Sequence, residues 1–517
     1  MKQPVSHFIR RHHALVALLI ALLSFFTAIG YNEANIHALK EVERTKHTTK
    51  TDSSWGWVAT VDDAAYIRPA ENYFHYHVWR DNNPGRQSYF LRTPGYGLFR
   101  YALMKIWGYD AAQRYFRYMQ VLLFAVSTFL LYRVGLMLNL SAGWALMAEI
   151  IYGLSPFAIG FLYYSLTEGL TPALMIAYIF LLLLAYRRRG PFFFLLAAVL
   201  MSYIGLVRPV LLIFAAALPL MAWWSTQNLP VLRRNAFVLL NILIIALPLI
   251  MWAYRSYRIA DEWVGIYPIY YAENNSQFRP THQAIWRFAS SFGMEGRTFH
   301  ESMVPLWQAT MHGDTGEVHI DSILMTIPPL VQRDLGEADL RKAYHLYRAS
   351  IVYQRDHYPR GTAMPDTISL IEREVISIFG HYTAQVHSTH PLSCHVLVPL
   401  KVFKVATLHS NLSLWIFQHT WRGTWWMEGL RLLFLLLHVA CCLSFLYFLI
   451  KGKRAARLIL GWLIVAYFFY LCYFFRGLEE RYTLPLLPLM LLAFMATLQN
   501  FATYAMKTFN KKVSAVQ

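Results

Sequence analysis

The sequence predicts an all-α polytopic membrane protein with about 10–12 transmembrane helices and a mostly helical extracytoplasmic domain. Of its 517 residues, 56% are hydrophobic and only 15% are charged, a composition that soluble proteins of this size rarely have. Apolar runs of about 20 residues, long enough to cross a bilayer, recur along the chain. The net charge is +18. Because no dense Lys/Arg tract occurs, we attribute this charge to cytoplasmic loops and contact with anionic membrane lipids, not to nucleic-acid binding.

The chain contains ten candidate spans. The first, from Ala14 to Gly30, follows Arg10 and Arg11. A cleaved signal peptide is the alternative interpretation, but many spans follow and no clean small-residue cleavage site is visible. The other candidates lie near residues 117–138, 143–162, 169–186, 191–206, 209–224, 236–254, 429–450, 456–475 and 483–504.

Basic residues gather at alternate turns between these spans. With the N-terminus in the cytoplasm, the turns at Arg187–Arg189, Arg233–Arg234 and Lys451–Arg454 are cytoplasmic, as the positive-inside rule requires. Two long segments, 31–116 and 255–428, are then external. The predicted regions are an N-terminal transmembrane region with its external loop, an external helical domain and a C-terminal transmembrane region, at 1–254, 255–428 and 429–517.

One stretch of the external domain, residues 392–418, is apolar but interrupted by Lys401, Lys404 and His409. A single extra span there would invert the last three helices and put Lys451–Arg454 outside. We therefore expect an interfacial or re-entrant segment.

The first external segment carries an acidic pair, Asp62 and Asp63, followed by Tyr66 at helical spacing. A carboxylate beside a membrane surface can act as a general base on an acceptor hydroxyl or amine. Close carboxylates also raise each other's pKa, which helps base function near neutral pH. The alternative is structural, because Asp is favoured at a helix N-terminus by the exposed N–H groups.

Two further motifs lie at the predicted outer boundary. Arg92 precedes the turn Pro94-Gly95-Tyr96, whose Pro and Gly fix the backbone. An interfacial elbow anchored by aromatic rings is the alternative for this motif. Glu168 lies at the outer end of a span, where an ionisable residue indicates function or caps the helix.

Two arginines complete the pattern. Arg208-Pro209 interrupts an apolar stretch of about 30 residues, which is too long for one ordinary span. Arg481-Tyr482 opens the last span. Arginine binds phosphate through a rigid fork of donors. The alternatives are snorkelling of Arg208 to lipid headgroups and neutralisation of Arg481 by the adjacent glutamates.

Together these residues resemble the GT-C superfamily of polytopic glycosyltransferases, in the branch of protein O-mannosyltransferases and lipid A aminoarabinose transferases. In that family an acidic motif in the first external loop carries the catalytic base, and Asp62-Asp63 stands where the family often has Asp-Glu. The other matching motifs follow in the family's order, at Tyr66, Pro94-Gly95-Tyr96, Thr167-Glu168, Arg208-Pro209 and Arg481-Tyr482. The resemblance covers most of residues 1–260 and 425–505.

The resemblance implies an inverting transferase that moves a sugar from a polyprenyl-phosphate donor to an extracytoplasmic glycan, lipid or protein acceptor. It implies Asp62 or Asp63 as the catalytic base. The implied substrate-binding residues are Tyr66, Arg92, Tyr96, Glu168, Arg208, Arg481 and Tyr482. One alternative is a polysaccharide polymerase or ligase, which favours arginines over an acidic base. Another is a non-enzymatic lipid or sugar transporter, in which inverted repeats and mid-span charges are commoner.

No cofactor is predicted, because no P-loop or Rossmann glycine pattern occurs. The histidines between His381 and His395 match no standard metal spacing. The four cysteines form no CxxC motif. The small number of cysteines favours a bacterial inner membrane. The predicted topology and the resemblance imply that the active site faces outside.

Overall fold

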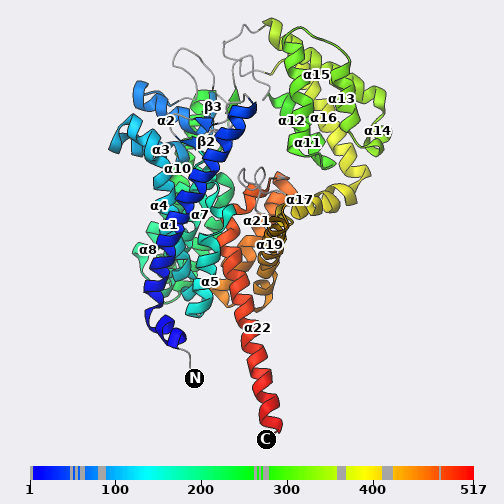
Figure 1. The fold of residues 1–517 in the computed structure, drawn as a ribbon. Coiled ribbons are helices and arrows are strands. Elements are labelled where there is room, and N and C mark those ends of the chain that lie inside the picture. The colour runs from blue at the N-terminus through cyan, green and yellow to red at the C-terminus, as the bar shows by residue number, and fades with distance from the viewer. Residues whose placement is uncertain are drawn as a thin grey trace.

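The computed structural model describes most of the chain and is 85% helix, with only two short strand pairs (Figure 1). This confirms the predicted fold class. The strands are β1 (Thr51–Asp52) with β2 (Trp57–Val58), and β3 (Tyr89–Leu91) with β4 (Ile269–Tyr271). The described residues are 4–46, 51–52, 56–58, 64–79, 89–260, 263, 265–266, 269–271, 279–357, 368–409, 423–476 and 479–516.

Within these ranges, seven helices are long and apolar enough to cross a membrane, which makes the chain a multi-pass integral membrane protein. They are His12–Glu41, Tyr109–Met137, Thr171–Arg188, Val231–Arg258, Trp425–Lys451, Arg454–Phe475 and Glu480–Thr508. Two shorter apolar helices, Pro191–Val207 and Pro209–Ser225, match two more predicted spans.

The predicted span at 143–162 is not continuous. It divides into α5 (Ala142–Gly153) and α6 (Pro156–Ile159). The break falls at Ser155, whose backbone is extended (φ −68°, ψ 120°). The residue before a proline is pushed out of the helical region by the proline ring, so Pro156 accounts for the break.

The other elements of the bundle come from two parts of the sequence. The N-terminal half contains α1 (Pro4–Lys46), α2 (Ala64–Tyr76), α3 (Gly95–Trp107), α4 (Tyr109–Met137), η1 (Thr167–Gly169), α7 (Thr171–Arg188), α8 (Pro191–Val207), η2 (Pro209–Ala216), α9 (Ala217–Ser225) and α10 (Val231–Ala260). The C-terminal region contains α19 (Trp425–Lys451), α20 (Arg454–Arg457), η4 (Leu458–Trp462), α21 (Leu463–Phe469), η5 (Tyr470–Phe475), η6 (Glu480–Leu486) and α22 (Leu487–Val516).

Between these halves lies a separate helical domain with its own core. Its helices are α11 (Pro280–Ser291), α12 (Gly296–Met311), α13 (Val318–Thr326), α14 (Pro329–Leu335), α15 (Glu337–His357) and α16 (Leu370–Thr389). The buried side chains of this core include Leu335 of α14 and Leu340, Tyr344, Tyr347 and Ile351 of α15. A buried bidentate pair joins its two ends, with Arg279 Nε 2.7 Å from Glu372 Oε1 and Nη2 2.8 Å from Oε2.

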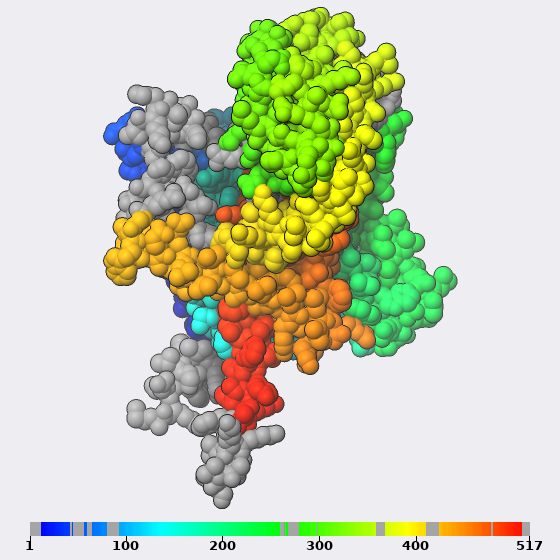
Figure 2. All heavy atoms as spheres, turned by 90° about the vertical axis from the view of Figure 1, so that its right-hand side faces the viewer, coloured from blue at the N-terminus to red at the C-terminus, as the bar shows by residue number. Residues whose placement is uncertain are grey.

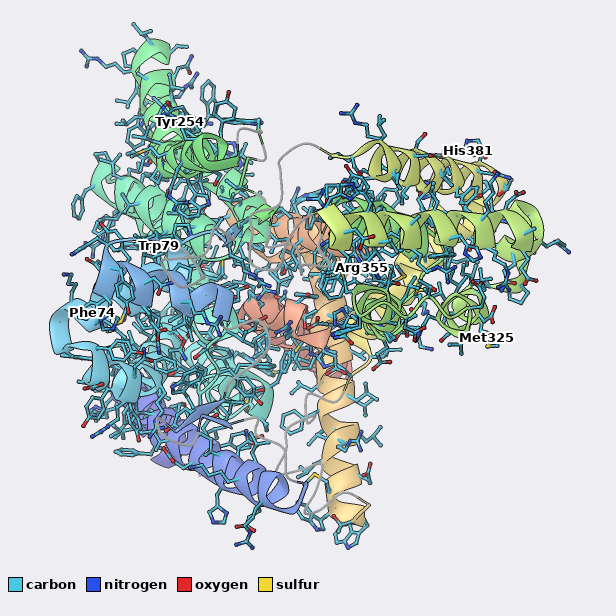
Figure 3. All side chains as sticks on the ribbon, turned by 90° about the horizontal axis from the view of Figure 1, so that it is seen from above. Phe74, Trp79, Tyr254, Met325, Arg355 and His381 are labelled. Carbon is cyan, nitrogen blue, oxygen red and sulfur yellow. The ribbon has the colours of Figure 1, made fainter. Side chains whose placement is uncertain are left out.

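The helical domain lies at the end of the bundle opposite both termini (Figure 1). Seen from above, it overhangs one side of the bundle. Arg355 is on the nearer side, and Met325 and His381 are on the far side (Figure 3). Arg476, directly after η5, joins the domain to the bundle by donating to Ser290 O (2.7 Å) on α11 and to Cys394 O (2.9 Å).

The segment that links the domain to the last spans runs through η3 (Ser393–Leu397) and α17 (Val398–Thr407). The continuous helix through η3 and α17 is not among the helices long and apolar enough to cross a membrane, and α17 packs against η5, η6 and α19. Figure 2 shows it beneath the domain, above the C-terminal spans. The interfacial or re-entrant course of 392–418 stays a prediction, and residues 410–418 lie outside the described part.

His282 makes the stability of the helical domain depend on pH. Burial, with a smaller contribution from His300, lowers the pKa of His282 from 6.5 to about 4. An unfolded His282 binds a proton below 6.5, whereas the folded state binds it only near 4, so stability is lost as the pH falls between these values. We expect a loss of about 3 kcal/mol across this window.

The test is thermal unfolding of the full-length protein in detergent across this pH window. His282→Leu should flatten the dependence, and the exposed His381→Leu should leave it unchanged. Equal slopes in all three proteins would contradict the assignment.

Candidate functional site

A cavity of about 610 Å³ opens at the end of the bundle that carries the helical domain. It is lined from α2, from the loop before α3, from η1, from the junction of α8 and η2, and from the segments on both sides of Arg476. Six of the seven predicted substrate-binding residues line it, namely Tyr66, Arg92, Glu168, Arg208, Arg481 and Tyr482.

Arg208 reaches the cavity because α8 stops there. Its backbone is extended (φ −149°, ψ 96°), as expected before Pro209, and its N–H still donates to Ile204 O (2.8 Å). The break predicted from Arg208-Pro209 is therefore present. The side chain is 10% exposed, and its Nη1 donates to Glu168 Oε1 at 3.0 Å.

Glu168 is the charged centre of the cavity. It lies on the short 3₁₀ turn η1, is 4% exposed, and accepts a hydrogen bond from Thr167 Oγ1 (3.2 Å). Its Oε1 is 3.0 Å from Arg208 Nη1 and 3.7 Å from Arg481 Nε. Burial raises the pKa of the Glu168 carboxyl, but the two guanidiniums outweigh it and the net shift is downward. Glu168 therefore stays ionised at neutral pH.

Arg481 enters from η6, at the start of the last span. It pairs with Glu479 and lies 3.7 Å from Glu168. The Tyr482 ring lies between the two arginines, with its centroid 5.3 Å from Arg208 Cζ and 5.9 Å from Arg481 Cζ. Neutralisation of Arg481 by Glu479 is thus present, but it does not remove Arg481 from the cavity.

Arg92 and Tyr66 form a second charged group on the cavity wall. Arg92 Nη1 donates to the Tyr66 hydroxyl, and its guanidinium lies 4.5 Å from the centroid of the Tyr66 ring. The pairing of β3 with β4 fixes the strand that leads into Arg92.

Tyr96, predicted alongside these residues, does not line the cavity. It is 0% exposed, donates to Gln120 Oε1 (3.2 Å), and packs edge-on against Tyr66 with ring centroids 5.8 Å apart. Its position supports the wall behind Tyr66.

The predicted catalytic pair, Asp62 and Asp63, lies outside the described residues. Both sides of the segment that carries it are described. Val58 N donates to Tyr163 O at 2.9 Å, five residues before the η1 glutamate. On the other side, α2 begins at Ala64 and brings Tyr66 into the cavity.

Other lining residues were not predicted. Tyr467, Tyr470 and Phe475 come from α21 and η5, and Glu479 follows them. Their spacing of three to five residues places the three rings on one helix side. Three arginines against two glutamates leave the charged lining at +1, and apolar side chains such as Leu212, Ile213 and Leu471 form the rest.

Comparisons with protein-family models, with curated proteins and with solved structures found no match. In the part of the chain that the structure describes, no group of three or more metal-ligating side chains occurs.

Gly95 allows the cavity wall to close. A Cβ at this position would lie 2.3 Å from Val207 N and 2.5 Å from Leu206 C, next to Arg208. Tyr203 also donates to Gly95 O at 3.0 Å. We expect Gly95→Ala to separate α3 from the end of α8 and to cost about 1–3 kcal/mol, as for other overpacked sites.

Thermal unfolding in detergent measures this cost. The control is Gly143→Ala on α5, where a Cβ meets nothing within 4 Å and should stabilise the helix by up to about 1 kcal/mol. A Gly95→Ala protein as stable as the wild type would show that the two helices can separate freely.

Proposed function

We propose that the protein is an integral-membrane glycosyltransferase. It transfers a sugar from a polyprenyl-phosphate donor to a glycan, lipid or protein acceptor, with inversion at the sugar carbon. The observation that carries the proposal is the convergence of Arg208 and Arg481, which are far apart in the sequence, on one cavity at the membrane boundary.

The arginines suit a leaving phosphate. Glu168 holds both guanidiniums in place before any ligand arrives, and such fixed donors need no reorganisation when charge develops. The positive excess of the lining favours an anion. The apolar part of the same cavity, around Leu212, Ile213 and Leu471, suits the first units of a lipid chain.

The base is assigned to Asp62 or Asp63. The acceptor hydroxyl gives its proton to that carboxylate while its oxygen attacks the sugar carbon. The bond from that carbon to the phosphate oxygen breaks, and the electron pair leaves with the lipid phosphate. The residues on both sides of this acidic pair support the assignment. Val58 N donates to Tyr163 O, and Tyr66 lines the cavity.

The proposed location of the cavity is the extracytoplasmic face of a bacterial inner membrane. The helix α7 starts beside Glu168 and ends at Arg188, about 27 Å away at 1.5 Å per residue. The turn at Lys451–Arg454 is likewise one span away from Phe475. Basic turns on the side away from the cavity support a cytoplasmic location for that side.

The phosphate role predicts that Lys cannot replace Arg. Arg208→Lys and Arg481→Lys keep the charge but lose the bidentate fork, so turnover should fall clearly. Replacement by Ala should raise the barrier by about 2–4 kcal/mol. The assay is sugar transfer from a purified polyprenyl-phosphate donor in nanodiscs.

The control for this experiment is Arg114→Ala, which replaces an exposed arginine near the start of α4. Size-exclusion profiles show whether each variant is folded. Wild-type turnover in both Lys variants would leave headgroup contact as the role of these arginines, whereas absence of transfer by the wild-type protein would favour the transporter interpretation.

The base assignment predicts a separate result. Asp62→Asn or Asp63→Asn should lower transfer about a hundredfold or more at one position and weakly at the other. Asp110→Asn, an exposed acid at the start of α4, is the matched control. Full activity of the double variant would favour a polymerase or ligase, which works without an acidic base.

A further inference from the structure

A further buried glutamate, Glu149, takes no part in the cavity. It lies on α5, seven residues after the helix begins at Ala142, about 10 Å along the helix axis. The residue is 0% exposed, and neither carboxylate oxygen has a hydrogen-bond partner among the described residues. An isolated carboxylate charge in such surroundings is very costly, and a carboxyl group there binds a proton instead.

Among the described residues of the helices packed against α5, no cation acts on the Glu149 carboxyl. These helices are α1, α4, α6 and α22. Between residues 14 and 32 of α1, throughout α6, and between residues 487 and 500 of α22, the sequence has no Asp, Glu, Lys, Arg or His. On α4, Tyr132 interacts electrostatically with both Glu149 and Arg133, and the Arg133 side chain is exposed. On α5 itself, Tyr152 is the one other ionisable group, and a tyrosine provides no cation.

Tyr132 on α4, which packs against α5, interacts electrostatically with Glu149, although no hydrogen bond joins the two side chains. It is 0% exposed and hydrogen-bonds to His13 Nδ1. His13 is partly exposed and follows a kink in α1 at His12, where the backbone is not helical (φ −119°, ψ 22°). A hydroxyl and an imidazole thus form a hydrogen-bonded pair that extends from the interior of α4 toward the surface.

We propose that Glu149 is a proton-binding site within the membrane, loaded from the side away from the cavity through His13 and Tyr132. His13 takes a proton from water at Nε2 and passes its Nδ1 proton to the Tyr132 oxygen. The Tyr132 hydroxyl proton then passes to the Glu149 carboxylate when a side-chain movement brings the two groups into contact, because no hydrogen bond joins them in the structure. The net change is one proton moved from water to Glu149, and both relay groups end neutral. This site is independent of glycosyl transfer.

Infrared spectroscopy of the full-length protein in nanodiscs tests the site. The wild-type spectrum should contain a protonated carboxyl C=O band that Glu149→Gln removes. Transfer to D₂O should shift this band. Tyr132→Phe keeps the ring but removes the relay hydroxyl, so the shift should slow about a hundredfold. The matched control is Tyr178→Phe, another buried tyrosine, whose hydroxyl donates to Phe214 O (3.0 Å).

Two results would overturn the proposal. An unchanged carboxyl band in Glu149→Gln would mean that Glu149 is ionised, and a wild-type exchange rate in Tyr132→Phe would remove the relay. If Glu149→Gln does not fold, a membrane-soluble carbodiimide gives a second readout on the wild type. It modifies buried protonated carboxyl groups, so peptide mass spectrometry should find Glu149 modified, and an unmodified Glu149 would count against the site.

Discussion

The cavity depends on one buried carboxylate. Glu168 is 4% exposed and holds Arg208 at 3.0 Å and Arg481 at 3.7 Å. Removing one partner from such a buried pair typically costs about 3–5 kcal/mol, because the other charge is left uncompensated. The three groups therefore hold one another, and with them the start of α7, the end of α8 and the start of the last span. The same ionic contacts therefore fix both the charges of the cavity and the positions of these helix ends.

The backbone departs from the α-helix beside each of these three residues. Three 3₁₀ segments, η1, η2 and η6, begin at or beside Glu168, Arg208 and Arg481. Near membrane depth, backbone that departs from the α-helix is tolerated where protein buries it or where it lines a cavity. Each break exposes a helix end and turns its charged side chain inward. Gly95 completes the wall, because only a residue without Cβ allows α3 to touch the backbone of α8.

The sequence predicted those features that depend on local chemistry. The break at Arg208-Pro209 follows from steric effects on the residue before proline, and the long spans follow from apolar length. The Glu168–Arg481 contact joins residues more than 300 positions apart, and no local pattern encodes it. Tyr96 was assigned to the site, but its position in the first turn of α3 buries it behind Tyr66. Tyr467 and Tyr470 were missed because a ring facing a cavity and a ring facing lipid look alike within an apolar run.

Glu149 was also overlooked in the sequence, where it is a single acid inside an otherwise apolar candidate span. Comparison with Glu168 shows what composition cannot reveal. Both side chains are at most 4% exposed. One faces two guanidiniums and accepts a hydroxyl hydrogen bond, whereas the other has no hydrogen-bond partner among the described residues. Burial favours the neutral acid in both cases, and only paired cations reverse it. The charge at the cavity is therefore fixed by its partners, while the charge at Glu149 is set by access to a proton. The two ends of the bundle can thus respond to different ligands, an anion at one end and a proton at the other.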